Sequence, residues 1–158
     1  MQIQNDTQSP ENNQSKTAYS ILVAISFAHF LNDMLQGVIP SIYPRLETEF
    51  GLSLGQIGMI TLCYQLAASL LQPVVGAYTD KYPKPYSQIF GMAFTLIGIL
   101  SLANASSYEW ILVSVVLVGI GSSVFHPESS RVAFMASGGK RSFAQSVFQI
   151  GGNMGTAL

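Results

Sequence analysis

Charged side chains are scarce in this sequence. Asp, Glu, Lys and Arg make up 9% of its 158 residues, whereas they make up about 25% of an average soluble domain. Hydrophobic residues make up 49%, so there is too little polar surface to cover a soluble core. With a net charge of −1, the chain lacks the basic excess typical of nucleic-acid-binding proteins, and we expect no nucleic-acid partner. The composition therefore predicts a protein that resides in a lipid bilayer.

Cysteine and the common metal and nucleotide motifs are also rare or absent. Cys63 is the single cysteine, so no disulfide can form within the chain. The sequence has no HExxH, CxxC or GxxxxGK[ST] pattern, and we expect neither a cofactor nor a metal site. Ser129 and Ser130 follow His126 closely, but closeness in sequence does not give a nucleophile and a base the geometry of a catalytic triad. We therefore expect that the protein is not an enzyme.

What the sequence has instead is a series of long hydrophobic runs. A transmembrane helix needs roughly 20 mostly apolar residues. Four runs approach or exceed that length and a fifth begins, at about 20–42, 54–78, 86–106, 110–128 and 142–158. Most charges lie in the gaps 43–53, 79–85, 104–109 and 129–141. This pattern predicts an all-α membrane protein, a helical bundle with four spans and most of a fifth.

The segment before the first run has a different composition. Residues 1–18 are rich in Gln, Asn, Ser and Thr, and such a segment has too few apolar residues to fold alone. It contains one basic residue, Lys16, and no short apolar core, which argues against a cleaved signal peptide. We predict a disordered tail.

The basic residues predict the orientation of the spans, because Lys and Arg in short loops stay on the cytoplasmic side. If the gaps alternate between the two sides, Arg45 alone falls opposite the N-terminus. The other six fall on the N-terminal side: Lys16, Lys81, Lys84, Arg131, Lys140 and Arg141. We therefore expect a cytoplasmic N-terminus and a multi-pass chain.

The sequence ends at Leu158, inside the fifth run. A membrane protein rarely ends within the hydrocarbon, so we expect a piece of a longer protein whose remaining helices would be its partners. A natural chain of four and a half spans is the alternative.

The first run carries polar residues on one helical face: Ser26, His29, Asn32, Asp33 and Gln36. A charge at the bilayer centre costs roughly 2.5–3.5 kcal/mol on insertion scales, so it persists where it faces a bundle interior or a watery cavity. One interpretation is that Asp33, with His29 nearby, lines a pathway or carries a proton, because this pair is suited to protonation at ordinary pH. The alternative is that Asp33 pairs with a neighbouring helix and only fixes the packing.

The second and fifth runs carry polar stripes of their own. The second has Gln65, Ser69, Gln72 and Gly76, and the fifth has Gln145, Gln149, Asn153 and Thr156. Such side chains either hydrogen-bond between helices or line a hydrated cavity. We favour the first interpretation for the second run, and both stay open for Gln149 and Asn153. Packing best explains Gly151, Gly152 and Gly155.

The fourth run ends in the densest group of reactive side chains. Pro127 is expected to kink or end the helix, next to His126, Glu128 and Arg131. Arg131 can neutralise Glu128 three residues away. His126 and Glu128 fit a substrate or proton site at a broken helix, whereas a structural ion pair at the helix end is the alternative and is favoured for Arg131.

The second gap resembles a loop signature of the major facilitator superfamily. Gly76, Asp80 and Lys81 match it, and Pro83 departs from it. The resemblance implies a gating loop, in which Gly76 allows close helix approach. Asp80 would cap the next helix or pair with a basic residue.

A closer resemblance covers nearly the whole chain after the tail. It is to the fosmidomycin-resistance efflux proteins, a branch of that superfamily, and is carried by His29, Leu31–Asp33, Ile57–Leu62, Leu71–Gly76, Thr79–Pro83 and Gly121–Arg131. It implies that residues 19–158 belong to the N-terminal six-helix half of a twelve-span antiporter. Such a protein would sit in the bacterial inner membrane and give antibiotic resistance by proton-driven export of a small drug-like compound.

In that fold the first and fourth spans line the central cavity, which is where His29, Asn32, Asp33, His126 and Glu128 fall. Asp33 is then the first candidate for the proton-coupling carboxylate, and Glu128, tuned by His126, is the second. Arg131 or Lys81 would attract an anionic substrate or close the inner gate with Asp80. An importer or uniporter of a metabolite or sugar, and a membrane module without transport activity, are the alternatives.

Overall fold

The computed structural model describes residues 16–158. Most of the predicted disordered tail, residues 1–15, lies outside this described part. The described residues contain no strand, and their helices are α1 (Tyr19–Ser41), α2 (Tyr43–Phe50), α3 (Leu54–Lys81), α4 (Ser87–Ala103), α5 (Tyr108–Met135) and α6 (Arg141–Thr156). The prediction of an all-α chain is confirmed.

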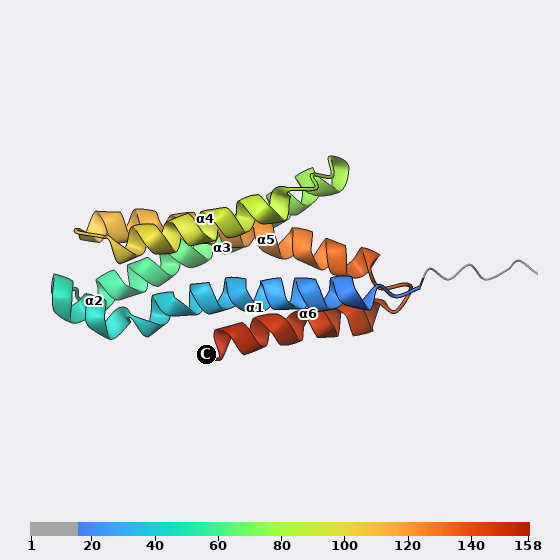
Figure 1. Ribbon diagram of the computed structural model, residues 1–158. Coiled ribbons are helices and arrows are strands. Elements are labelled where there is room, and N and C mark those ends of the chain that lie inside the picture. The colour runs from blue at the N-terminus through green and yellow to red at the C-terminus, as the bar shows by residue number, and fades with distance from the viewer. Residues whose placement is uncertain (1–15) are drawn as a thin grey trace, which may run out of the picture.

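The helices form two packed layers (Figure 1). α3 and α4 pack on α5 in one layer, and α1 packs along α6 in the other. α5 also contacts α1 and α6, so it joins the two layers. The start of α1, the α3–α4 turn and the α5–α6 turn lie at one end, whereas α2 and the α4–α5 turn lie at the opposite end.

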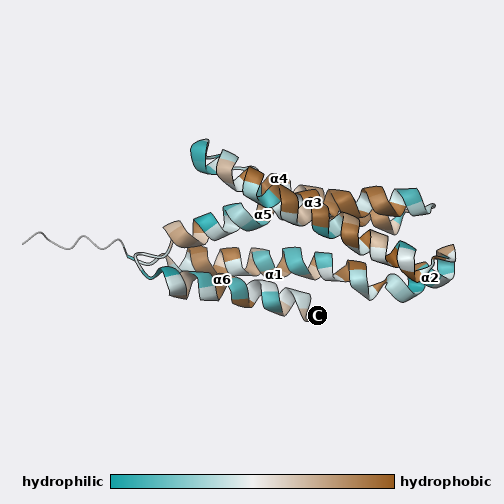
Figure 2. Cartoon of the chain, turned by 180° about the vertical axis from the view of Figure 1, so that it is seen from behind, coloured by the Kyte–Doolittle hydropathy of each residue, from teal (hydrophilic) through white to brown (hydrophobic). Residues whose placement is uncertain are grey.

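Three helices within residues 16–158 are long and apolar enough to cross a membrane, namely α1, α3 and α5, with 23, 28 and 28 residues. α4 is apolar but has 17 residues, and α6 has 16. Large hydrophobic side chains such as Val23, Leu70 and Val113 are exposed. Figure 2 shows hydrophobic residues concentrated on α3 and α4, and hydrophilic ones at the ends of the bundle and along α1 and α6. Exposed apolar surface of this extent is typical of a protein that contacts lipid or further helices.

The gap 43–53 between the first two apolar runs contains the short helix α2. Pro44 occupies the first turn, where a missing N–H costs no hydrogen bond. Leu46 is buried against the core between α1, α3 and α5. Gly51, with φ of 63°, then ends the helix. A short amphipathic helix forms here because one apolar side chain finds a buried position.

The fourth run does not end at residue 128, because α5 continues to Met135. Pro127 lies inside α5, so the prediction that this helix could end there is wrong. Gly76 of α3 lies opposite the proline, and a Cβ at Gly76 would come within 3.7 Å of the Pro127 Cβ. Pro127 lacks an N–H, so α5 loses one backbone hydrogen bond at this point. Packing of α5 against α3, α4 and α1 compensates for this loss, and the helix continues.

Candidate functional site

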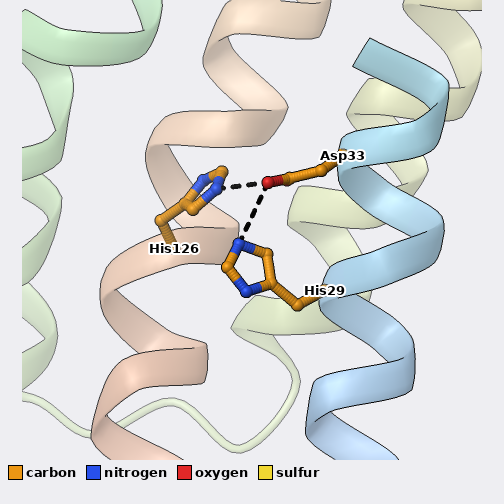
Figure 3. Close-up of side chains that lie close together, drawn as sticks. All are labelled: His29, Asp33 and His126. Atoms are coloured by element: carbon orange, nitrogen blue, oxygen red, sulfur yellow. Dashed lines mark ion pairs between the residues drawn. The ribbon is translucent and has the colours of Figure 1, made fainter. Parts of the chain in front are cut away.

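Asp33 lies between two histidines that come from different helices (Figure 3). His29 is one turn before Asp33 on α1, and its Nε2 is 3.1 Å from Asp33 Oδ2. His126 lies on α5, and its Nε2 is 3.3 Å from Asp33 Oδ1. Each carboxylate oxygen therefore has its own imidazole. We call these three residues the His–Asp–His cluster.

The cluster is largely buried and lies well inside the two long helices. The side chains of His29, Asp33 and His126 are 4%, 16% and 26% exposed, so His126 is the most accessible member. A carboxylate is tolerated at such depth when it is paired and faces the bundle interior. The structure thus unites two predicted site residues of the first run with one of the fourth.

Backbone carbonyl oxygens contact the Nδ1 atom of each imidazole ring, which is the nitrogen that does not face Asp33. His29 Nδ1 is 2.9 Å from the Phe148 carbonyl oxygen of α6, and the Phe148 ring stacks on the His29 ring at a centroid distance of 4.0 Å. His126 Nδ1 is 2.9 Å from the Ser122 carbonyl oxygen. A carbonyl oxygen only accepts hydrogen bonds, so Nδ1 of each ring donates and Nε2 faces Asp33.

Gly152 of α6 makes room for the His29 ring. A Cβ at Gly152 would come within 2.8 Å of His29 Nδ1 and closer still to other ring atoms, which is a separation that real side chains do not show. The packing interpretation of this glycine is confirmed, because α6 can approach α1 here only without a side chain.

Asn32 and Gln36 extend the polar network from α1 to three other helices. Asn32 is fully buried, donates to Asp33 Oδ1 over 3.2 Å and accepts from Thr95 of α4 over 3.2 Å. Gln36 Oε1 accepts from Tyr64 of α3 and from Ser122 of α5. Tyr64, Thr95 and Ser122 were not predicted as network members, because single hydroxyls within apolar runs give no periodic signal.

Glu128 and Arg131 form a second charged group that is separate from the His–Asp–His cluster. Glu128 is 2% exposed, and its Oε2 accepts from Arg131 Nη2 over 2.7 Å and from Ser87 of α4 over 2.6 Å. The predicted pairing of Arg131 with Glu128 is confirmed. His126 pairs with Asp33 and not with Glu128.

The residues of the predicted gating loop lie in helices. Gly76, Asp80 and Lys81 belong to the last two turns of α3, where Asp80 and Lys81 are exposed. Asp80 does not cap α4, whose N-cap is Tyr86, and it forms no ion pair within the described residues. The structure thus leaves these two charges accessible at the end of the bundle.

An open groove of about 420 Å³ runs beside the His–Asp–His cluster. It is lined by Gln72, His126, Pro127, Ser130, Gln145, Phe148 and Gln149. Gln145 is anchored, since its Nε2 donates to the Ser130 carbonyl oxygen over 2.9 Å. Gln149 and Asn153 are exposed on α6, and Gln65 and Ser69 on α3. His126 therefore connects the buried carboxylate with a groove rich in amides.

Comparison with known proteins fixes the family. The model of the Major Facilitator Superfamily matches residues 25–158, which is most of the chain. The chain belongs to the major facilitator superfamily. It is an integral, multi-pass membrane protein, and the resemblance drawn from its motifs is confirmed.

Two bacterial relatives in this superfamily are similar over nearly the whole chain. A fosmidomycin resistance protein of Escherichia coli (strain K12) is 60% identical over 92% of this chain and 36% of its own length. An uncharacterized MFS-type transporter, YfnC, of Bacillus subtilis (strain 168) is 49% identical over 90% of this chain and 35% of its own length. The chain thus spans about a third of the length of these relatives. No solved structure matches it.

Within this superfamily member, the site combines three properties. It holds a carboxylate oxygen within 3.1–3.3 Å of each of two imidazoles. It connects α1 with α5, which belong to different layers. It also borders a groove through His126. A change in the charge of the cluster would therefore be felt by both layers and by any molecule in the groove.

Proposed function

We propose that the full-length protein is a proton-coupled transporter that exports a small drug-like compound by alternating access. The observation that carries this proposal is Asp33, held between imidazoles of α1 and α5 beside an open polar groove. The 60% identity to a protein named for fosmidomycin resistance supports export as the direction and an antibiotic as the substrate class.

The proposed coupling works through the charge of Asp33. While Asp33 is ionised and both imidazoles also carry a proton at Nε2, the opposite charges attract and hold α1 against α5. Protonation of the Asp33 carboxylate removes its negative charge and weakens the link between the two helix layers. This change favours one of the two states of the transporter, open to the inside or open to the outside. A substrate that binds beside His126 competes with the proton for the same partners. Glu128 is the second candidate, but it is already paired with Arg131 and Ser87.

The remaining site residues have supporting roles in this proposal. Lys81 and Asp80 are exposed at the end of α3, where Lys81 attracts an anionic substrate or closes the inner gate with Asp80. Gly76 has a smaller role, because a Cβ there would only touch Pro127 at 3.7 Å. Arg131 has a smaller part there, since Glu128 neutralises it. Gln149 and Asn153 are exposed on α6 and form a cavity wall that further helices complete.

We place the protein in the bacterial inner membrane with its N-terminus in the cytoplasm. Lys81, Lys84, Lys140 and Arg141 lie at the end of the bundle where α1 begins, and Arg45 lies on α2 at the opposite end. This distribution supports the cytoplasmic assignment of the first end, because basic residues stay on that side.

The test is the growth of a drug-sensitive bacterium that expresses the full-length gene, with fosmidomycin and a panel of unrelated drugs. We expect resistance and a low drug accumulation that rises when an uncoupler is added. Asp33→Asn should abolish both, because an amide cannot exchange the proton. Glu109→Gln, a matched change at the exposed start of α5, should retain both.

Three outcomes would contradict parts of this proposal. If Asp33→Asn retained export and its pH dependence, Asp33 would not be the coupling residue. If the wild type reached the membrane but gave no resistance to any compound, an importer or uniporter of a metabolite would be favoured, and a uniporter would move no protons in vesicles. If Asp33→Asn lost folding as well as activity, the cluster would serve packing.

A further inference from the structure

We propose that His29, Asp33 and His126 form a binding site for a divalent transition-metal cation. The proposal rests on the geometry of these three side chains and does not depend on drug export. Their ligand atoms all lie within 4.8 Å of one another, and two imidazole nitrogens with a carboxylate oxygen are a common donor set for such cations.

The hydrogen bonds of the two rings leave the correct atoms free for a metal. In metal sites, a ligating histidine usually donates its other N–H to a carbonyl or carboxylate oxygen, which fixes the ring. His29 Nδ1 donates to the Phe148 carbonyl and His126 Nδ1 donates to the Ser122 carbonyl. In neutral rings held in this way, each Nε2 carries a lone pair that faces Asp33.

A proton or a metal cation has to lie between these atoms. A neutral Nε2 and a carboxylate oxygen are both acceptors, and two acceptors approach to 3.1 or 3.3 Å when a proton or a cation lies between them. Two protons can meet this need, one at each contact. One divalent cation at the centre of the cluster would bridge both Nε2–carboxylate contacts at once. This cation is the occupant that we propose.

The distances fit metal coordination with a small adjustment. With metal–ligand bonds of about 2.0–2.1 Å, two ligands of a tetrahedral site are about 3.3 Å apart. The two Nε2–carboxylate separations, 3.1 Å to Oδ2 and 3.3 Å to Oδ1, are close to this value, and each uses a different oxygen of Asp33. No two ligand atoms of the three residues are more than 4.8 Å apart. His126 is the most exposed of the three and can move toward His29 to close the site.

The groove supplies both the entry path and the open coordination positions. His126 lines the groove, so a cation can reach the cluster from there. Three protein ligands leave at least one position for water or for a metal-binding substrate. Imidazole donors favour Zn²⁺, Co²⁺ or Fe²⁺ over Mg²⁺ and Ca²⁺, which prefer oxygen ligands. No sequence motif marks this site, because His126 lies far from His29 and Asp33 along the chain.

The test is a titration of the purified full-length protein in lipid nanodiscs with Co²⁺, followed by its visible absorption bands, and with Zn²⁺ by calorimetry. We expect saturable binding of one ion at this site. His29→Gln, His126→Gln and Asp33→Asn should each weaken it at least tenfold, because each removes one of three ligands. Glu109→Gln, at the exposed start of α5, should bind as the wild type does.

Equal binding by the wild type and the three ligand variants would overturn the proposal, as would the absence of saturable binding to the wild type. Should a variant fail to fold, X-ray absorption of Zn²⁺ bound to the wild type decides, with two imidazole ligands expected and fewer than two overturning the proposal. The readout needs no drug or proton gradient, so failure of export and failure of metal binding are separate results.

Discussion

Asp33 shows how a single charged residue is held within the membrane. Its carboxylate has an imidazole at each oxygen and the Asn32 amide at Oδ1. Asn32 in turn is held by Thr95 of α4. Every one of these partners comes from a helix, so their positions depend on packing and not on a loop. A carboxylate placed in this way is stabilised by partners whose positions the helix packing determines.

Glu128 and Arg131 allow a prediction about stability at the residue scale. Arg131→Ala leaves the buried Glu128 carboxylate with Ser87 as its remaining partner, and breaking a buried ion pair costs about 3–5 kcal/mol. We expect a clear fall in the unfolding temperature of the full-length protein in detergent. Because Arg45 pairs with Glu49 at the exposed surface, Arg45→Ala should cost less than about 1 kcal/mol. Equal effects of the two variants would show that Glu128 does not need the pair.

At the scale of the helices, the contact between α1 and α6 decides the shape of the site. The Phe148 ring stacks on the His29 ring, and the Phe148 carbonyl oxygen accepts a hydrogen bond from His29 Nδ1. Ser26 adds a second link, because its hydroxyl donates to the Val147 carbonyl over 2.7 Å. α6 is therefore the element that orients His29, although it carries no ligand or charge in the cluster.

Gly152 tests this role of α6. Gly152→Val places a branched side chain against the His29 ring and should destabilise the full-length protein by about 1–3 kcal/mol, as overpacking does. It should also lower drug resistance, because His29 is displaced. Gly58 of α3 has open space around it, so Gly58→Val should change the unfolding temperature far less. Unfolding curves and the drug-growth assay measure both effects; a harmless Gly152→Val would mean that α6 does not set the position of His29.

For the whole molecule, the two ends of the bundle differ in charge. Lys81, Lys84 and Lys140 lie at the end where α1 begins. The opposite end carries Glu47, Glu49 and Glu109 together with Arg45. Between these ends, α3 and α4 are mostly hydrophobic (Figure 2). The molecule is therefore asymmetric along the direction in which its long helices cross a bilayer.

Cysteine labelling of the full-length protein tests this arrangement. In a background that lacks Cys63 and any other cysteine, Asn104→Cys should react with a membrane-impermeant maleimide on intact cells. Lys84→Cys and Lys140→Cys should react only after the cells are opened, because these positions lie at the other end of the bundle. Labelling of Asn104→Cys and Lys84→Cys from the same side would show that the 17 residues of α4 do not cross the membrane.

Much of the fold could be predicted from the sequence. The apolar runs located α1, α3, α4, α5 and α6 to within a few residues, except at the end of α5. They did so because an apolar stretch of this length can satisfy its backbone in a bilayer only as a helix. The end of the run 110–128 was wrong, since local propensity does not include the packing of Ala133 against α1 and α6 that accompanies the continuation of α5 to Met135.

The sequence by itself determined that His29 and Asp33 share one face of a helix, because a spacing of four residues places them one above the other. It also determined the superfamily, through motifs that cover most of the chain. Only the tertiary structure decided that His126 completes the cluster, that Glu128 pairs away from it, and that Phe148 and Gly152 hold His29 in place. These contacts join residues far apart in the chain, and their formation depends on how closely α1, α5 and α6 approach, which no local pattern records.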